Sequence, residues 1–164
     1  MKFRMSPTRA RIPSSVLVYR TDDYSFDMNP TPSGGFTSAL LDDLNLELDI
    51  EGRVISVWGL CPHTRWKEAD LMPPDAEFGE LFVVPSVPLK AGVSVPINDK
   101  KYWPVLVDPS SGWVRVTSEA TATATAAVGT TSLVKIMPGV IVQITEEGKL
   151  AGLWLRPERL PNGR

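Results

Sequence analysis

The stretch LNLELDIEGRVISVWGL, residues 44–60, carries the clearest structural pattern in the chain. Its first part alternates between polar side chains and the apolar side chains of Leu44, Leu46, Leu48 and Ile50. This period of two is typical of a strand with one face in a core and the other in water. Residues 53–60 are apolar on both faces, as in a central strand. A Glu-Gly pair closes the intervening loop, where a positive φ favours glycine. We therefore predict a hairpin over 44–60, with Gly52 as its turn glycine.

The stretch VIVQITEEGKLAGLWLR, near the end of the chain, repeats this pattern. Aligning Gly148 on Gly52 also places Trp154 on Trp58. We therefore predict a second hairpin over 139–156, with Gly148 as its turn glycine. The pair fits an internal duplication, and it fits equally well two hairpins that converged under the same physics.

Further strand patterns recur at short intervals, over residues 15–19, 80–85, 93–97, 104–108, 112–117 and 132–136. Fifteen prolines and twelve glycines among 164 residues indicate many turns and few long helices. Short helices are expected over 38–44, and from Arg65 or Lys67 to Leu71. The sequence predicts an all-β or β-rich α+β fold, in which antiparallel hairpins form a single partly closed barrel or sandwich with one or two short helices.

The length of the chain suggests one domain. Residues 1–14 are expected to be a flexible basic tail, 15–158 a single β-rich domain, and 159–164 a C-terminal tail. The Thr/Ala-rich segment 117–131 is expected to be a weak edge strand or a mobile loop.

Composition and charge narrow the classes of function. A single cysteine forms no internal disulfide, which argues against a cysteine-stapled secreted scaffold. The N-terminus lacks the apolar stretch of a signal peptide, and no apolar run approaches membrane-spanning length. The net charge of -2, the pI of about 5.4 and the scattered cations do not favour binding to nucleic acid. We expect a cytoplasmic protein that binds neither membranes nor nucleic acid.

The only cysteine and the only histidine, Cys61 and His63, lie two positions apart in LCPHTRW. Cys-Pro-His resembles half of a Rieske iron–sulfur motif, but a Rieske centre needs two cysteines and two histidines. A structural zinc site fails on the same ligand count, so no metal or cofactor is expected. The pair, with Arg65, would suit nucleophilic catalysis if the thiol had a lowered pKa. Because free cysteines are commonly buried, we favour a structural role for Cys61.

The chain contains five tryptophans. Trp58 and Trp154 hold equivalent hairpin positions and are predicted to lie in the core. The others lie near loops, where aromatic side chains either cap a core or form a protein-binding surface. The residues predicted to bind a partner are Arg65, Trp66, Tyr102, Trp103 and Trp113.

The segment PGVIVQITEEGKLAGLWL, residues 138–155, resembles the ending of a small bacterial family of unknown function. Members carry a Gly-Val-x-Val strand, an acidic-Gly turn and a Gly-Leu/Ile-x-Leu strand. The matching residues are Gly139, Val140, Val142, Gly148, Leu150, Gly152 and Leu153. Proteins of this kind are similar to partners found beside small toxin genes. The resemblance therefore implies a binding role, and it transfers no functional residue.

The leading prediction is a non-catalytic cytoplasmic protein of the immunity or antitoxin kind, which binds another protein such as a toxin or effector. An acidic inhibitor of this kind steers toward basic surfaces. One alternative is a small enzyme, or an accessory subunit, with a pocket near Cys61 and His63. Another is a structural or assembly protein of a phage or secretion apparatus, in which strand edges pair between subunits.

Overall fold

The computed structural model describes residues 1–7, 12–97, 102–118 and 131–161. These residues form short strands and one 3-10 turn, His63–Arg65. The strands are β1 (Lys2–Pro7), β2 (Val16–Arg20), β3 (Ser25–Asn29), β4 (Thr37–Leu41), β5 (Leu44–Leu48), β6 (Val54–Leu60), β7 (Lys67–Glu68), β8 (Gly79–Val84), β9 (Val95–Pro96), β10 (Val105–Asp108), β11 (Trp113–Thr117), β12 (Thr131–Met137), β13 (Val140–Thr145) and β14 (Leu150–Leu155).

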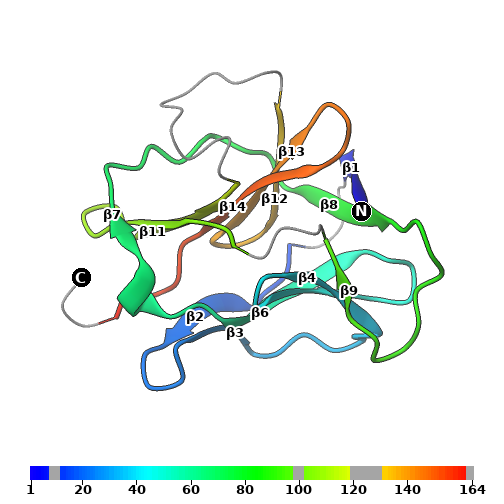
Figure 1. The fold of residues 1–164 in the computed structure, drawn as a ribbon, viewed down its shortest axis with the longest axis horizontal. Coiled ribbons are helices and arrows are strands. Elements are labelled where there is room, and N and C mark those ends of the chain that lie inside the picture. Colours follow the sequence, from blue (N-terminus) through cyan, green and yellow to red (C-terminus); the bar gives the residue numbers. More distant parts are fainter. Residues whose placement is uncertain (8–11, 98–101, 119–130, 162–164) are drawn as a thin grey trace.

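In the described part of the chain, the strands form three sheets, and none of these sheets closes into a barrel (Figure 1). One six-stranded sheet has the order β2-β3-β6-β5-β4-β9, and the other has the order β12-β13-β14-β11-β10-β7. The third sheet is the two-stranded ribbon β1-β8. Pairing is antiparallel except where the two-residue strands β7 and β9 join β10 and β4. The predicted β-rich fold of antiparallel hairpins is confirmed.

The two large sheets repeat one arrangement of five strands. The order β2-β3-β6-β5-β4 in the first corresponds to β10-β11-β14-β13-β12 in the second. The predicted hairpins are β5–β6 and β13–β14, and each has its register shift at the same aligned position. The shifts fall between Glu47 and Leu48 and between Gln143 and Ile144. The similarity noticed in the hairpins therefore extends to a whole five-stranded unit.

The ribbon β1-β8 joins these two units through the hairpin turns. The Val83 N–H donates to the Gly52 carbonyl at 2.9 Å, and the Phe3 N–H donates to the Gly148 carbonyl at 2.7 Å. Phe3 and Val83 also lie opposite each other in the ribbon. Gly52 and Gly148 have φ values of +80° and +78°, which confirms both predicted turn glycines.

One hydrophobic cluster runs through the ribbon and both large sheets. It includes Phe3 and Leu81 from the ribbon, Leu46 from the first sheet, and Leu153 from the second. A smaller cluster around Leu71, Ile141 and Trp154 contains Trp113 and residues of the loop after β7. The two sheets are thus held together mainly by burial of apolar surface.

The predicted N-terminal tail is wrong for its first residues. Lys2–Pro7 form β1, because Phe3 is only 4% exposed in the core and Met5 packs against it. At the other end, the Glu158 N–H donates to the Leu17 carbonyl, and Leu160 packs against the core. Of the Thr/Ala-rich segment, residues 119–130 lie outside the described residues.

The two predicted helices are also wrong. Residues 38–44 form most of β4, a turn at Asp42 and Asp43, and the start of β5. The inward side chains Thr37, Ala39 and Leu41 keep the period of a strand, and Asp42 takes the positive φ that a tight turn requires. Residues 65–71 contain only the end of the 3-10 turn and β7. No helix in the described residues is long and apolar enough to cross a membrane.

Replacing Gly148 by alanine should destabilise the protein more than replacing Gly92. Both glycines have positive φ, so either substitution strains the backbone by about 1–2 kcal/mol. A Cβ atom at Gly92 meets open space, whereas one at Gly148 lies 2.8 Å from the Phe3 carbonyl oxygen. Urea denaturation of both variants measures the difference. Equal losses in the free energy of unfolding would show that the contact with β1 contributes nothing.

Candidate functional site

The Cys-Pro-His segment lies just beyond β6 and is held by one tyrosine of β2. The Tyr19 hydroxyl donates to the Cys61 carbonyl at 2.9 Å and accepts from the His63 N–H at 3.1 Å. It also lies 3.2 Å from the His63 Nδ1 atom. The imidazole ring stacks on Tyr24. His63 is therefore placed by two tyrosines in an aromatic cluster.

The Cys61 thiol does not have the properties of a nucleophile. The residue is only 6% exposed. Burial raises the pKa of the thiol to about 12, although a hydrogen bond from the Trp66 side chain acts in the opposite direction. Since the thiolate is the reactive form, such a group is essentially unreactive near neutral pH. The structural role expected for Cys61 fits its position.

The residues predicted to bind a partner separate into buried and accessible ones. Trp66 and Trp103 are 4% and 2% exposed, so the prediction that they form a binding surface is wrong. Trp66 stacks on Phe26 in the core, with ring centroids 5.8 Å apart. Tyr102 is 50% exposed and Arg65 is exposed. Trp113 is half-buried.

Trp113 packs edge-on against Trp154. The two tryptophans at equivalent hairpin positions, Trp58 and Trp154, differ in burial. Trp154 is 5% exposed, as predicted, because the loop after β7 adds Leu71 and Ala76 to its cluster. Trp58 is 42% exposed, so its predicted core position is wrong. Its side chain lies on the face of β6 opposite the core residue Val57.

A small cavity brings four of the predicted site residues together: Cys61, Arg65, Tyr102 and Trp103. Asp42 also lines it and accepts a 2.6 Å hydrogen bond from the Trp103 backbone N–H. Burial raises the pKa of the Asp42 carboxyl. The cavity holds about 90 Å³, well below the roughly 300–1,000 Å³ of common ligand pockets. It is too small for a ligand of ordinary size.

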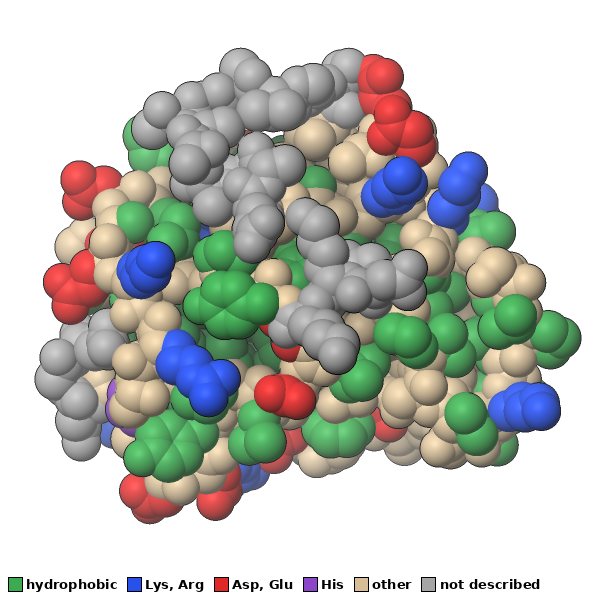
Figure 2. Space-filling view, in the orientation of Figure 1, with side chains coloured by type: hydrophobic (Ala, Val, Ile, Leu, Met, Phe, Trp, Pro, Cys, Tyr) green, Lys and Arg blue, Asp and Glu red, His purple; other side chains and the backbone are tan. Residues whose placement is uncertain are grey.

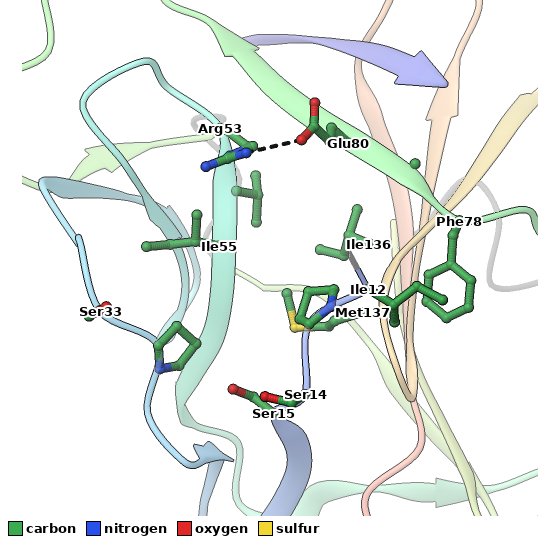
Figure 3. Close-up of a pocket in the computed structure, with 14 residues that line it drawn as sticks. Ile12, Ser14, Ser15, Ser33, Arg53, Ile55, Phe78, Glu80, Ile136 and Met137 are labelled. Atoms are coloured by element: carbon green, nitrogen blue, oxygen red, sulfur yellow. Dashed lines mark hydrogen bonds and ion pairs between the residues drawn. The ribbon is translucent and has the colours of Figure 1, made fainter. Parts of the chain in front are cut away.

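A larger pocket of about 430 Å³ lies beside the first residues of β6, and we call it the β6 pocket. Figure 3 shows Arg53 and Glu80 at one end and Ser14 and Ser15 at the other. Between these ends, the apolar walls include Ile55, Phe78, Ile136 and Met137. Apolar walls with a few polar groups at the ends are typical of binding sites.

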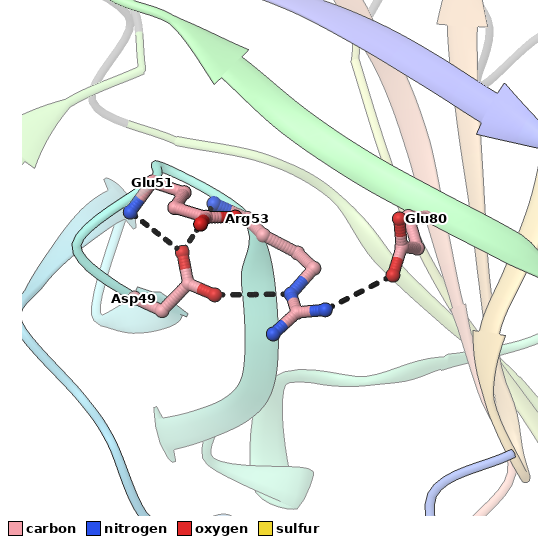
Figure 4. A network of polar contacts seen from close by, with 4 residues as sticks. All are labelled: Asp49, Glu51, Arg53 and Glu80. Carbon is pink, nitrogen blue, oxygen red and sulfur yellow. Dashed lines mark hydrogen bonds and ion pairs between the residues drawn. The ribbon is translucent and has the colours of Figure 1, made fainter. Parts of the chain in front are cut away.

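The charged end of the β6 pocket is organised around Arg53 (Figure 4). Its guanidinium donates to Asp49 and to Glu80, each at 3.0 Å. The hydrogen bond to Glu80 is the main reason why the pKa of Arg53 is raised. Asp49 also accepts from the Glu51 N–H at 3.0 Å. The guanidinium therefore pairs with two carboxylates, which leaves an excess of one negative charge.

Sequence reasoning missed the β6 pocket. Its walls come from the segment before β2, the loop after β3, and strands β6, β8 and β12, which are far apart in the chain. The predicted strands over 53–60, 80–85 and 132–136 contain several of its lining residues, but none of these residues was predicted to form a site. Among the described residues, no three Cys, His, Asp or Glu side chains gather as metal ligands would.

No protein-family model matches the chain, and no curated protein matches it significantly. The similarity of residues 138–155 to a small bacterial family therefore stays a prediction.

Replacing the buried Trp103 by alanine should lower the free energy of unfolding by about 3–5 kcal/mol. Its neighbour Tyr102 is half exposed, so Tyr102→Ala should change stability by less than about 0.5 kcal/mol. Chemical denaturation of the two variants measures this contrast. A Trp103→Ala protein as stable as the parent would place the indole outside the core.

Native Cys61 should react with iodoacetamide at least about 100-fold more slowly than Cys61 in urea-unfolded protein at pH 8. The cause is the rise of its pKa from 9.0 to about 12 on burial. Because the folded-state pKa is the higher one, this group's contribution to stability is complete below pH 9 and is lost as the pH rises toward 12. Mass spectrometry of timed samples gives the rates. Similar rates in both states would restore Cys61 as a candidate nucleophile.

Proposed function

We propose that this chain is a non-catalytic cytoplasmic protein of the immunity or antitoxin kind, which binds another protein through the β6 pocket. The observation that carries the proposal is the pocket itself, with its volume of about 430 Å³, apolar walls and one charged end. Its opening is bordered by Ile12, which is 50% exposed. Apolar side chains beside a charged rim suit protein recognition.

The chemistry of the pocket does not favour an enzyme. Its described lining residues include no histidine and no cysteine, and its arginine and glutamate are paired with each other. The alternative site near Cys61 lacks an activated thiol, because the pKa of that group is raised. A nucleophile without an adjacent base is weak at neutral pH.

The charges also favour a protein partner over nucleic acid. On the face drawn in Figure 2, Lys and Arg side chains stand singly or in pairs among hydrophobic and neutral ones. At the charged end of the pocket, Arg53 pairs with Glu80 in the lining and with Asp49 behind it, so two carboxylates meet one cation. Phosphate would be repelled there, whereas a basic protein surface would be attracted.

Blocking the pocket should abolish capture of the partner and leave the fold intact. Ser33 is exposed at the pocket wall, so Ser33→Trp fills the space without removing a core side chain. Ser86→Trp makes the same change in an exposed loop and is the matched control. Tagged proteins are used to capture partners from the native host, and co-purifying proteins are identified and quantified by mass spectrometry.

The expected result is one stoichiometric partner that is retained by Ser86→Trp and lost by Ser33→Trp. Equal capture by both variants would exclude the β6 pocket as the contact. Tyr102→Ala and Leu60→Ala test the exposed residues beside the small cavity. Loss of the partner in those variants alone would move the binding surface there.

A further inference from the structure

Strand β6 is open along one side for most of its length. On one side it pairs with β5 from Val54 to Gly59. On the other side it pairs with β3 only at Gly59 and Leu60. Beyond the start of β6, Arg53 forms a bridge to Phe82 of β8. Among the described residues, no strand pairs with residues 54–58 on this side.

In the second large sheet, β11 pairs with the part of β14 that corresponds to the open part of β6. The pair Val114 and Leu155 corresponds to Phe26 and Gly59, but there the ladder continues to Thr117 and Gly152. The next residue, Ser118, donates its N–H to the Ala151 carbonyl. The opening beside β6 therefore distinguishes two otherwise similar units.

The sequence of β3 gives a local reason for the opening. The Met28 N–H donates to the Asp27 side chain at 2.8 Å. Two residues later, Pro30 stands at the position that corresponds to Ser118 and carries no N–H to donate. The ladder that would close the first sheet therefore stops at Phe26.

The β6 pocket lies along the first part of this open side. Arg53, Val54 and Ile55 line it, and Ser14 and Ser15 mark its other end, just before β2 (Figure 3). The open stretch, residues 54–58, is bounded by β8 at one end and by β3 at the other. Since paired strands rise by the same distance per residue, about 3.3 Å, it can accommodate an extended segment of up to about five residues.

The charges at this end determine which side chain the segment can place there. The carboxylates of Asp49 and Glu80 both pair with the single guanidinium of Arg53, so negative charge exceeds positive charge by one. A cationic side chain placed there gains an opposite charge, whereas an acidic one is repelled. The walls further along, which include Val54 and Ile136, accept apolar side chains.

We propose that the β6 pocket binds an extended segment of a partner protein as an added strand on β6, with apolar residues followed by a lysine or arginine near Glu80. Main-chain hydrogen bonds to a strand edge supply affinity in this mode, and the side-chain pockets supply specificity. The inference rests on the proposed function, because it names the part of the partner that enters the same pocket.

The test uses synthetic peptides and the full chain. The probe is acetyl-Val-Thr-Val-Lys-amide, and its controls are the same peptide ending in Glu and a backbone N-methylated copy. Binding is followed by NMR of the methyl groups of Ile55, Ile136 and Met137, which line the pocket. The Lys peptide should shift these signals at millimolar concentration, and the two controls should not.

A charge variant tests the preference for a basic side chain separately from the proposal that the β6 pocket binds a partner protein. Glu80→Gln should weaken binding of the Lys peptide by about fivefold, whereas Glu158→Gln, on an exposed residue after β14, should not change it. Equal binding of the N-methylated peptide would overturn strand addition, and equal binding of the Glu peptide would overturn the basic preference. No shift with the Lys peptide would overturn both, while loss of the partner in Ser33→Trp would still support the pocket.

Discussion

Two backbone hydrogen bonds, from Phe3 to Gly148 and from Val83 to Gly52, set the arrangement of the whole molecule. Each joins the ribbon β1-β8 to the turn of one hairpin, so each five-stranded unit is fixed to a strand at the centre. Both turns need a residue with positive φ, and the Gly148 turn has no room for a side chain beside the Phe3 carbonyl. Once the ribbon is in place, the apolar faces of both large sheets share one core. The constraint is local, but the burial that it permits extends through the protein.

The β6 pocket results from a difference in strand pairing between the two five-stranded units, which otherwise have the same strand order. In the second unit, β11 pairs with β14 as far as Gly152. In the first, β3 leaves β6 after Phe26, and segments before β2 and after β3 form walls around the exposed part of the strand. Unpaired strand edges usually attract other chains, and proteins commonly cover or charge them. Here the edge lies in a pocket with a charged end, which restricts what can reach it.

The sequence predicted the strands better than the surface. Periodicity located both hairpins, and their loops identified Gly52 and Gly148, because these signals are local. The same method wrongly predicted a helix over 38–44, where a short apolar run with acidic residues at its end fits a strand and a turn equally well. It placed Trp103 on the surface because the residue follows a loop, although tertiary packing buries it. Sequence patterns could not predict the β6 pocket, because it forms where five segments that are far apart in the chain meet.

The contact between β1 and the second hairpin also determines when the chain can finish folding. Lys2–Pro7 are synthesised before the other strands, yet their ladder partner, β8, is about eighty residues away. Their contact at Gly148 joins residues about 145 positions apart in the chain. Contacts between such distant residues cost loop-closure entropy before they repay it, and folds rich in them form slowly. The ribosome therefore delivers β1 well before the Gly148 turn that it contacts. During that interval the apolar side chains of Phe3 and Met5 lack part of the core that covers them, and transiently exposed apolar surface of this kind favours aggregation.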